Sequence, residues 1–475
     1  MIGRIKEVND LNRIFASKKS EFVAIYGRRR VGKTYLVREL FGNRFAFSYT
    51  GIIGIPLSRQ LAQFHKALQH YGCKETRRPI DWFEAFDRLQ KTLEASSVRR
   101  KIIFIDELPW LDTPKSNFLP ALGAFWNSWC DARKDILLIV CGSASSWIVN
   151  KLFRNRGALH NRVTWRIKLL PFTLGECERL TAEQGITMSR TDIAECYMAV
   201  GGIPYYWNYL SAGNSLAQNF NEMFFAEGAP LKNEFRELFA SLFKNSDIYT
   251  KIAAALARKK GGMTRSEIVS AVPGLPMNGK LTEILDTLEE SGFVRTVPAY
   301  GNQRRGSFYQ LIDNFTLFHF SFLSPGKASS SNPDFWQSTF LSPALNTWRG
   351  LSFERLCLQH IEQIKKALGI SGVYSIAYAW RHEADECYPK GVQIDLVLDR
   401  ADRIVNVCEM KFTSGPYAID KSAAENLRAK VEAFAAATKT RKGIQLVVVS
   451  AEGLAKTMYS GMINRSVTLD DLFSL

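Results

Sequence analysis

The chain has 475 residues, of which 46% are hydrophobic and 23% charged, so it is long enough for about three globular domains with sizeable cores. Its 62 Lys and Arg residues outnumber its 46 Asp and Glu residues, and the resulting net charge of +16 indicates a polyanionic partner, nucleic acid before others. No apolar run is long enough to span a bilayer, and the eight cysteines are scattered without metal-ligand spacing, which excludes a membrane span or a zinc site and favours a reduced, cytoplasmic protein.

A phosphate-binding loop is predicted near the amino terminus. Residues 22–26 form an apolar run typical of a buried strand, and residues 35–41 show helical apolar spacing. Between them lies Gly-x-x-x-x-Gly-Lys-Thr, whose glycines let backbone N–H groups converge on phosphate oxygens. An ordinary glycine turn is the alternative. The strand before the glycines and the helix after them favour a phosphate loop, because this motif requires both and a plain turn requires neither. We therefore expect nucleotide binding by Gly27, Arg28, Arg29, Arg30, Val31, Gly32, Lys33 and Thr34.

A second strand supplies the acidic half of this site. Residues 102–105 predict a fully buried parallel strand, with Asp106 and Glu107 at its carboxyl end. Lys33 can reach the β- and γ-phosphates, and Thr34 and Asp106 can hold Mg²⁺. Glu107 can orient or deprotonate the attacking water. A strand that ends in Asp-Glu is common by itself, but after a phosphate loop it predicts hydrolysis of a nucleoside triphosphate.

Four segments together resemble a known family. The phosphate loop, residues 104–107 (Phe-Ile-Asp-Glu), 170–174 (Leu-Pro-Phe-Thr-Leu) and 200–205 (Val-Gly-Gly-Ile-Pro-Tyr) are similar to the archaeal-type ATPases, AAA-related proteins close to the STAND group. The resemblance covers most of residues 1–245. It implies an ATPase core over residues 1–165, a helical lid over residues 166–245, and ATP as the nucleotide.

The resemblance also implies roles for single residues. Ser143, at the end of a predicted strand, matches the residue that senses the γ-phosphate, although a serine turn that caps the next helix explains it equally well. Arg162 best matches an arginine finger that reaches a neighbouring subunit, which implies a homo-oligomer. A plain surface charge is the alternative. In such proteins the Gly-Gly-x-Pro segment of the lid lies against the nucleotide, a role that falls on Gly201, Gly202 and Pro204.

Residues 246–323 predict a winged helix, with three helices and a hairpin whose loop carries Arg304 and Arg305. The third helix has four acidic residues against one lysine, and phosphate would repel it. A scaffold role is therefore favoured over sequence-specific DNA reading, with the two loop arginines best able to touch a phosphate backbone. Residues 324–344, rich in Ser, Pro and Gly at their start, are predicted to be a linker.

Residues 345–475 predict a smaller α/β domain. A helix carries Glu354, the first strand of a hairpin carries Asp395, and the second strand carries Glu409 and Lys411 two residues apart, so that these two project from one face. A helix and a strand follow. This order resembles the PD-(D/E)xK nuclease fold, although Ile394 stands where that motif has proline.

The resemblance implies a metal-dependent nuclease site. Asp395 and Glu409 are hard oxygen ligands suited to Mg²⁺ or Mn²⁺, Glu354 can complete the metal shell, and Lys411 can position the attacking water. The sequence thus predicts a multidomain α/β protein in which a P-loop, AAA-type three-layer ATPase core with a helical lid and a winged helix regulates a restriction-endonuclease-like domain that acts on nucleic acid, DNA more than RNA. The alternative is a STAND-like switch whose inactive carboxyl-terminal domain is a binding module.

Overall fold

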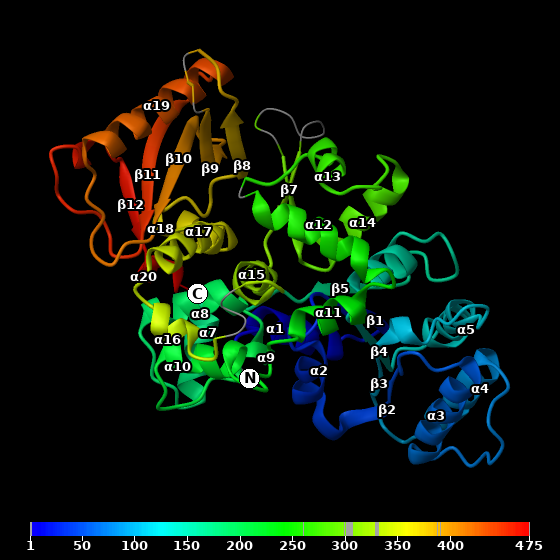
Figure 1. The fold of residues 1–475 in the computed structure, drawn as a ribbon. Helices are drawn as coiled ribbons and strands as arrows, with labels where there is room; N and C mark the ends of the chain where they lie inside the picture. The colour runs from blue at the N-terminus through cyan, green and yellow to red at the C-terminus, as the bar shows by residue number, and fades with distance from the viewer. Residues whose placement is uncertain are drawn as a thin grey trace. The chain divides into compact units, whose positions relative to one another are not determined.

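The computed structural model describes residues 2–259, 261–298, 300, 307–327, 332–386, 388–389 and 391–474 (Figure 1). The chain divides into two compact units, Met1–Pro171 and Phe172–Leu475. Over the described residues, no helix combines the length and apolar character that crossing a membrane requires. The cysteines in the described ranges, seven in number, are all free thiols.

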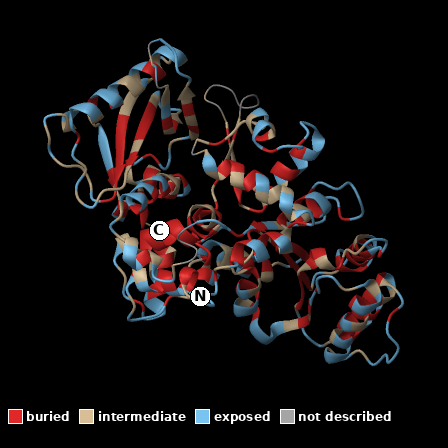
Figure 2. Ribbon diagram, in the orientation of Figure 1, coloured by how far each residue is buried: buried red, intermediate tan, exposed pale blue. Residues whose placement is uncertain are grey.

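The amino-terminal unit is built on a parallel sheet of five strands in the order β2-β3-β4-β1-β5. The strands are β1 (Glu21–Tyr26), β2 (Phe45–Thr50), β3 (Lys101–Asp106), β4 (Ile136–Gly142) and β5 (Trp165–Lys168). Every residue of β3 and β4 is buried, so helices must cover both faces of the sheet, as expected for a three-layer core (Figure 2). The helices are α1 (Ile5–Phe15), α2 (Lys33–Phe41), α3 (Leu57–His70), α4 (Trp82–Ala95), α5 (Phe118–Phe125) and α6 (Ser145–Trp147).

The carboxyl-terminal unit begins with helices. The region expected to form the lid contains α7 (Leu174–Glu183), α8 (Arg190–Val200), α9 (Pro204–Trp207), α10 (Leu216–Phe220) and α11 (Glu234–Leu242). Three helices and an antiparallel hairpin follow, as expected for residues 246–323: α12 (Ser246–Arg258), α13 (Arg265–Ala271), α14 (Gly279–Glu290), β6 (Val294–Val297) and β7 (Phe308–Leu311). Thr264 and Glu267 form the capping box that opens α13. Arg304 and Arg305 lie outside the described residues.

Part of the expected linker is packed rather than exposed. After α15 (Asn314–Phe318), residues 335–339 form α16 (Phe335–Thr339), and the Trp336 side chain is fully buried. Its ring contacts those of Phe220, Phe318 and Trp348. The second half of the expected linker is therefore a packed helix that an aromatic cluster holds in place, and only its first half has a linker-like composition.

A second five-stranded sheet completes this unit, in the order β12-β11-β10-β9-β8. The predicted sequence of helix, two strands, helix and strand is present, with β8 and β12 as additional strands on its two edges. The elements are α17 (Pro343–Gln359), α18 (Ile361–Ala367), β8 (Ser375–His382), β9 (Val392–Arg400), β10 (Ile404–Lys411), α19 (Lys421–Thr438), β11 (Gly443–Ser450), β12 (Arg465–Thr468) and α20 (Leu469–Leu472).

Candidate nucleotide site

The glycine loop lies at the carboxyl edge of the first sheet, between β1 and α2. Gly27 and Gly32 adopt φ values of +141° and +93°, which residues with a side chain rarely adopt. A Cβ atom on Gly27 would also lie 2.3 Å from the carbonyl oxygen of Leu169. Only glycine therefore fits the first position of the loop.

Lys33 contacts the loop backbone, and Thr34 contacts the end of β3. The Lys33 Nζ donates to the carbonyl oxygens of Gly27 and Arg28 at 3.0 Å each. Burial lowers the pKa of Lys33, whereas the neighbouring carboxylates Glu107 and Asp106 raise it. The Thr34 hydroxyl donates to the Asp106 carboxylate at 2.7 Å. Two hard oxygen groups are thus already adjacent, and this donor set suits Mg²⁺.

Asp106 is the last residue of β3 and Glu107 follows it, and their carboxylates have different partners. Burial raises the pKa of Asp106, and the hydrogen bond from Thr34 opposes that shift. Glu107 has a left-handed backbone with φ of +48°, and its carboxylate accepts hydrogen bonds from the Ser143 N–H at 3.2 Å and the Ser143 hydroxyl at 2.9 Å. The predicted water-activating carboxylate and the predicted γ-phosphate sensor are therefore in direct contact.

Two further residues hold the loop, and the predicted site did not include them. The Ser145 hydroxyl, fully buried at the start of α6, accepts a hydrogen bond from the Gly27 N–H at 3.0 Å. Arg4, which precedes α1, donates to the carbonyl oxygen of Val31 at 3.1 Å. The sequence signal for Arg4 is the pattern Gly3-Arg4…Glu7…Leu11 before the first strand, which resembles the adenine-side box of AAA-like ATPases. Ser145 has no signal beyond its place after the fourth strand.

Replacing Ser145 with alanine is expected to weaken ATP binding about tenfold, because the buried Gly27 N–H would lose its acceptor at a cost of roughly 1–3 kcal/mol. Titration with a fluorescent ATP analogue measures the effect. Ser146→Ala is the matched control, since Ser146 is the next residue and only partly buried. Equal affinities in the two variants would contradict a role for Ser145 in holding the loop.

The predicted arginines lie in different environments. Arg28 is buried, and its guanidinium donates to the carbonyl oxygen of Arg29 at 3.4 Å. Arg29 and Arg30 are partly buried in the loop. Arg162 precedes β5 at the opposite, amino edge of the sheet, where it pairs with Asp131 at 3.4 Å. Its action in a neighbouring subunit stays a prediction.

In the lid segment, close packing requires glycine. A Cβ atom on Gly202 would lie 1.9 Å from the Phe172 carbonyl oxygen, and the Phe172 N–H donates to the Gly202 carbonyl oxygen at 2.6 Å. Gly201 ends α8 with φ of +64°, and Pro204 is the first residue of α9. Contact of this segment with the nucleotide stays a prediction.

In the second sheet, Glu409 and Lys411 share a face as predicted. The Lys411 Nζ lies 2.9 Å from one Glu409 oxygen, and the Lys430 Nζ of α19 lies 2.6 Å from the other. Burial raises the pKa of Glu409, but Lys430 and Lys411 outweigh this effect and hold the pKa below its ordinary value. Burial lowers the pKa of Lys411, but Glu409, with a smaller contribution from Glu354 of α17, keeps it raised. The carboxylate is thus already neutralised by two cations.

Asp395 lies on β9, the strand that pairs with β10, next to the pair of Leu396 with Cys408. Tyr378 of β8 pairs with Val397 and Trp380 pairs with Ile394, so Asp395 and Leu396 share one position as a bulge. Ile394 and Val397 pack in the hydrophobic cluster under α19 together with Val405, Val407 and Phe434.

Asp395 and Leu396 line a small pocket with Leu358 of α17 and Ile361 of α18. A shared metal site of Asp395 with Glu409 and Glu354 stays a prediction. In the described ranges, no three His, Cys, Asp or Glu side chains are placed to hold a metal ion together.

A parallel sheet with a glycine loop after its first strand, and with a lysine, a threonine and two carboxylates at its carboxyl edge, defines a P-loop nucleoside-triphosphate hydrolase. Residues 1–210 match the family described as an ATPase domain predominantly from Archaea, so this part of the chain is similar to that family.

Relatives of the whole chain are distant. An uncharacterized protein of Methanocaldococcus jannaschii is 25% identical over 426 residues, which cover 86% of this chain and 87% of that protein. The chain is similar to the Walker-type ATPase of Pyrococcus abyssi, with 17% identity, a TM-score of 0.47, and coverage of 67% of this chain and 96% of that one. The ORC2 protein of Aeropyrum pernix gives 12% identity and a TM-score of 0.39, with coverage of 71% and 95%.

Proposed function

We propose that this protein is an ATP-driven switch that hydrolyses ATP with Mg²⁺ in its amino-terminal unit and uses its carboxyl-terminal unit as a nucleic-acid-binding module. The contact between Glu107 and Ser143 carries this proposal. In this scheme Ser143 holds the Glu107 carboxylate when no nucleotide is bound and contacts the γ-phosphate when ATP is bound. ATP binding would therefore control whether Glu107 can activate water. A triphosphate that engages Ser143 would release Glu107 toward the attacking water.

The residues of the loop have distinct tasks in this scheme. Lys33, whose Nζ donates to two carbonyl oxygens of the loop, would turn to the β- and γ-phosphates. Thr34 and Asp106 would hold Mg²⁺, which offsets phosphate charge when bound. Glu107 would orient the water and accept its proton. Arg162, exposed at the opposite edge of the sheet, would act only across a subunit interface and therefore only in a homo-oligomer.

For the carboxyl-terminal unit, binding is favoured over cleavage. Lys411 and Lys430 neutralise Glu409, and Gln393 donates to the Asp395 carboxylate at 2.6 Å. A metal-dependent nuclease needs at least two carboxylates that converge on one ion. The lysines at this site suit phosphate contact without hydrolysis.

A cleavage assay tests the two functions together. Wild-type protein, Lys33→Ala and Asp395→Ala are incubated with supercoiled plasmid, single-stranded DNA and RNA, with Mg²⁺ or Mn²⁺, with and without ATP. We expect ATP hydrolysis that Lys33→Ala abolishes, nucleic-acid binding by all three proteins, and no cleavage. Cleavage by the wild type that Asp395→Ala removes would overturn the binding-module proposal and establish an ATP-regulated nuclease.

A further inference from the structure

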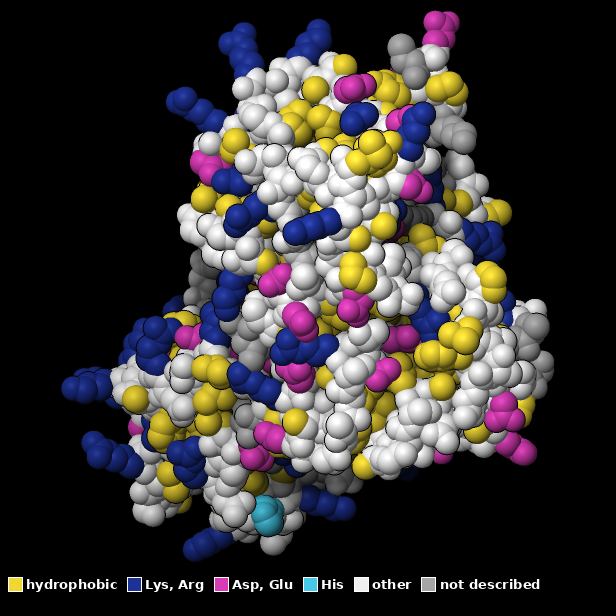
Figure 3. Space-filling view, turned by 90° about the vertical axis from the view of Figure 1, so that its left-hand side faces the viewer, with side chains coloured by type: hydrophobic (Ala, Val, Ile, Leu, Met, Phe, Trp, Pro, Cys, Tyr) yellow, Lys and Arg dark blue, Asp and Glu magenta, His cyan; other side chains and the backbone are white. Residues whose placement is uncertain are grey.

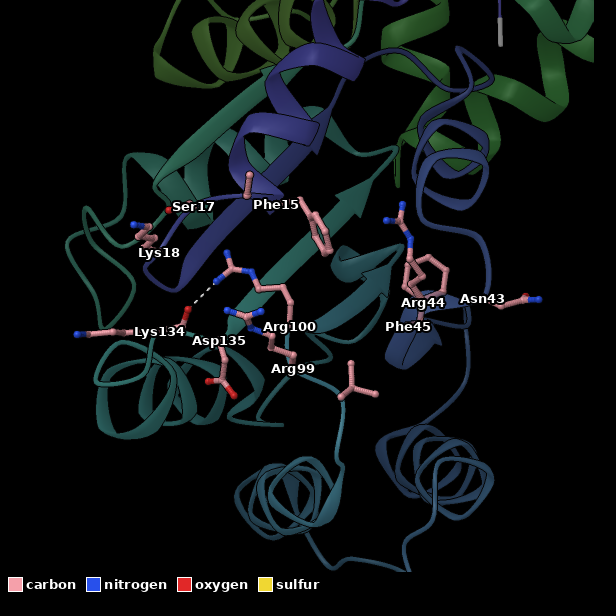
Figure 4. A pocket seen from close by; sticks show the side chains of 12 residues that line it. Phe15, Ser17, Lys18, Asn43, Arg44, Phe45, Arg99, Arg100, Lys134 and Asp135 are labelled. Atoms are coloured by element: carbon pink, nitrogen blue, oxygen red, sulfur yellow. Dashed lines mark hydrogen bonds between the residues drawn. The ribbon is translucent and has the colours of Figure 1, made fainter.

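A basic pocket lies at the amino edge of the first sheet, the edge opposite the nucleotide site. Its lining comes from segments that directly precede β1, β2, β3 and β4, including Phe15, Arg44, Arg99 and Lys134 (Figure 4). The pocket has a volume of about 930 Å³. Because strands of six residues separate the two edges, this basal pocket is roughly 20 Å from the phosphate loop.

The charge of the basal pocket is strongly one-sided. Its lining holds five cationic side chains and one carboxylate: Lys18, Arg44, Arg99, Arg100, Lys134 and Asp135. Arg133 contacts both oxygens of that carboxylate at 2.7 Å, and this contact lowers the pKa of Asp135 to about 2. On the face drawn in Figure 3, by contrast, Lys and Arg side chains are interspersed with Asp and Glu.

The cations of the pocket divide into two groups. Arg100 is structural, because its guanidinium donates to the carbonyl oxygens of Lys19 and Lys134 at 2.8 Å each. Arg44 donates to the carbonyl oxygens of Leu40 and Phe41 at the end of α2 and stacks over the Phe15 ring at 5.1 Å. These contacts fix the floor of the pocket.

The second group is available to a ligand. Lys18, Arg99 and Lys134 are exposed, and within the described part of the chain their side chains make no hydrogen bond or ion pair. They come from three different segments around one pocket. Three exposed cations spread around a rim can contact successive phosphates of a polymer.

The pocket does not suit a compact triphosphate. A phosphate loop binds such a group with converging backbone N–H groups. At the basal pocket, by contrast, Arg100 and Arg44 donate to carbonyl oxygens at the ends of α1 and α2. Positive charge is supplied only by long side chains. That chemistry is typical of contacts with a nucleic-acid backbone.

We propose that the basal pocket of the ATPase domain binds the phosphate backbone of nucleic acid through Lys18, Arg99 and Lys134. This inference deepens the proposed function, because it places a nucleic-acid contact on the ATPase domain itself. Arg100 and Arg44 shape the pocket, and the three exposed cations contact phosphates. Binding here leaves the nucleotide site at the other edge accessible.

The test compares two triple variants of the full chain by fluorescence anisotropy with a labelled single strand and a labelled duplex. Lys18→Glu/Arg99→Glu/Lys134→Glu removes the rim cations, and Lys66→Glu/Lys74→Glu/Lys91→Glu makes the same charge change at exposed lysines elsewhere in this unit. We expect the rim variant to lose affinity on the order of 100-fold, and its slope of log affinity against log salt to fall by about 2 to 3. The control variant should lose far less.

Three outcomes would overturn the proposal: equal losses in the two variants, an unchanged salt slope in the rim variant, or competition by poly-glutamate as strong as by the oligonucleotide. The last would indicate an acidic protein partner instead. Unchanged basal ATP hydrolysis in the rim variant shows that the domain is folded. Repeating the titration in the Lys33→Ala background separates this site from the ATP-driven switch, because basal-pocket binding should persist there even if the switch does not exist.

Discussion

Glu107→Gln is expected to slow ATP hydrolysis by about 100-fold to 10,000-fold while ATP affinity stays within about threefold of the wild type. The amide cannot accept the proton of the attacking water, yet it keeps the size of the carboxylate and can still accept from Ser143. Lys33, Thr34 and Asp106, which would bind the phosphates and Mg²⁺, are unchanged. Single-turnover hydrolysis and nucleotide titration on the same preparation measure the two quantities separately.

The informative control is Lys33→Ala, which should lose ATP binding and hydrolysis together. If Glu107→Gln hydrolyses ATP at the wild-type rate, another group activates the water, and the Glu107–Ser143 contact is then merely structural. A loss of binding in Glu107→Gln equal to that in Lys33→Ala would also contradict the assigned role. Ser143→Ala should slow hydrolysis less than Glu107→Gln does, because it removes the hydroxyl donor to Glu107 and leaves the N–H donor.

Local sequence signals were sufficient for the nucleotide site. The glycine loop, its flanking strand and helix, and the acidic strand end are each contiguous, and the carboxyl ends of parallel strands always meet at one edge of a sheet. Those facts predict that Thr34 and Asp106 lie at the same edge of the sheet, and the structure joins them by a hydrogen bond of 2.7 Å. Ser145 could not be found in this way, because its role depends on the turn that follows β4 rather than on a residue pattern.

The second sheet shows where periodicity fails. Glu409 and Lys411 were correctly placed on one face, because β10 has a regular pleat through both. The bulge that Asp395 and Leu396 form in β9 leaves no mark in the sequence, so alternation along the strand does not determine the face of Asp395. Lys430 lies 21 residues beyond Glu409 on α19, and only the packing of that helix reveals the contact.

Removing Arg349 is expected to destabilise the carboxyl-terminal unit by about 3–5 kcal/mol. Its guanidinium donates to both Glu195 oxygens at 2.9 Å, and the two side chains, which join α17 to α8, have exposed fractions of only 7% and 6%. In Arg349→Met the Glu195 carboxylate would be buried without its cation. Urea unfolding followed by tryptophan fluorescence reports the loss, since Trp336 and Trp348 lie in this unit.

The pH dependence distinguishes a stranded carboxylate from a general packing defect. Burial already raises the pKa of Glu195, and the hydrogen bonds from Arg349 oppose that shift. Without Arg349 the folded pKa rises further above the unfolded value, so the variant should be most stable at acidic pH and lose stability as the pH rises through the folded pKa.

Glu195→Leu/Arg349→Met removes the titrating group and should recover part of the lost free energy with no such slope. A variant Arg349→Met whose stability is flat from acidic to neutral pH would instead attribute the defect to the lost contacts of Arg349 with the Phe340 carbonyl and the Asn346 side chain. In that case the ion pair would not be the interaction that holds α8, which ends at Gly201, against α17.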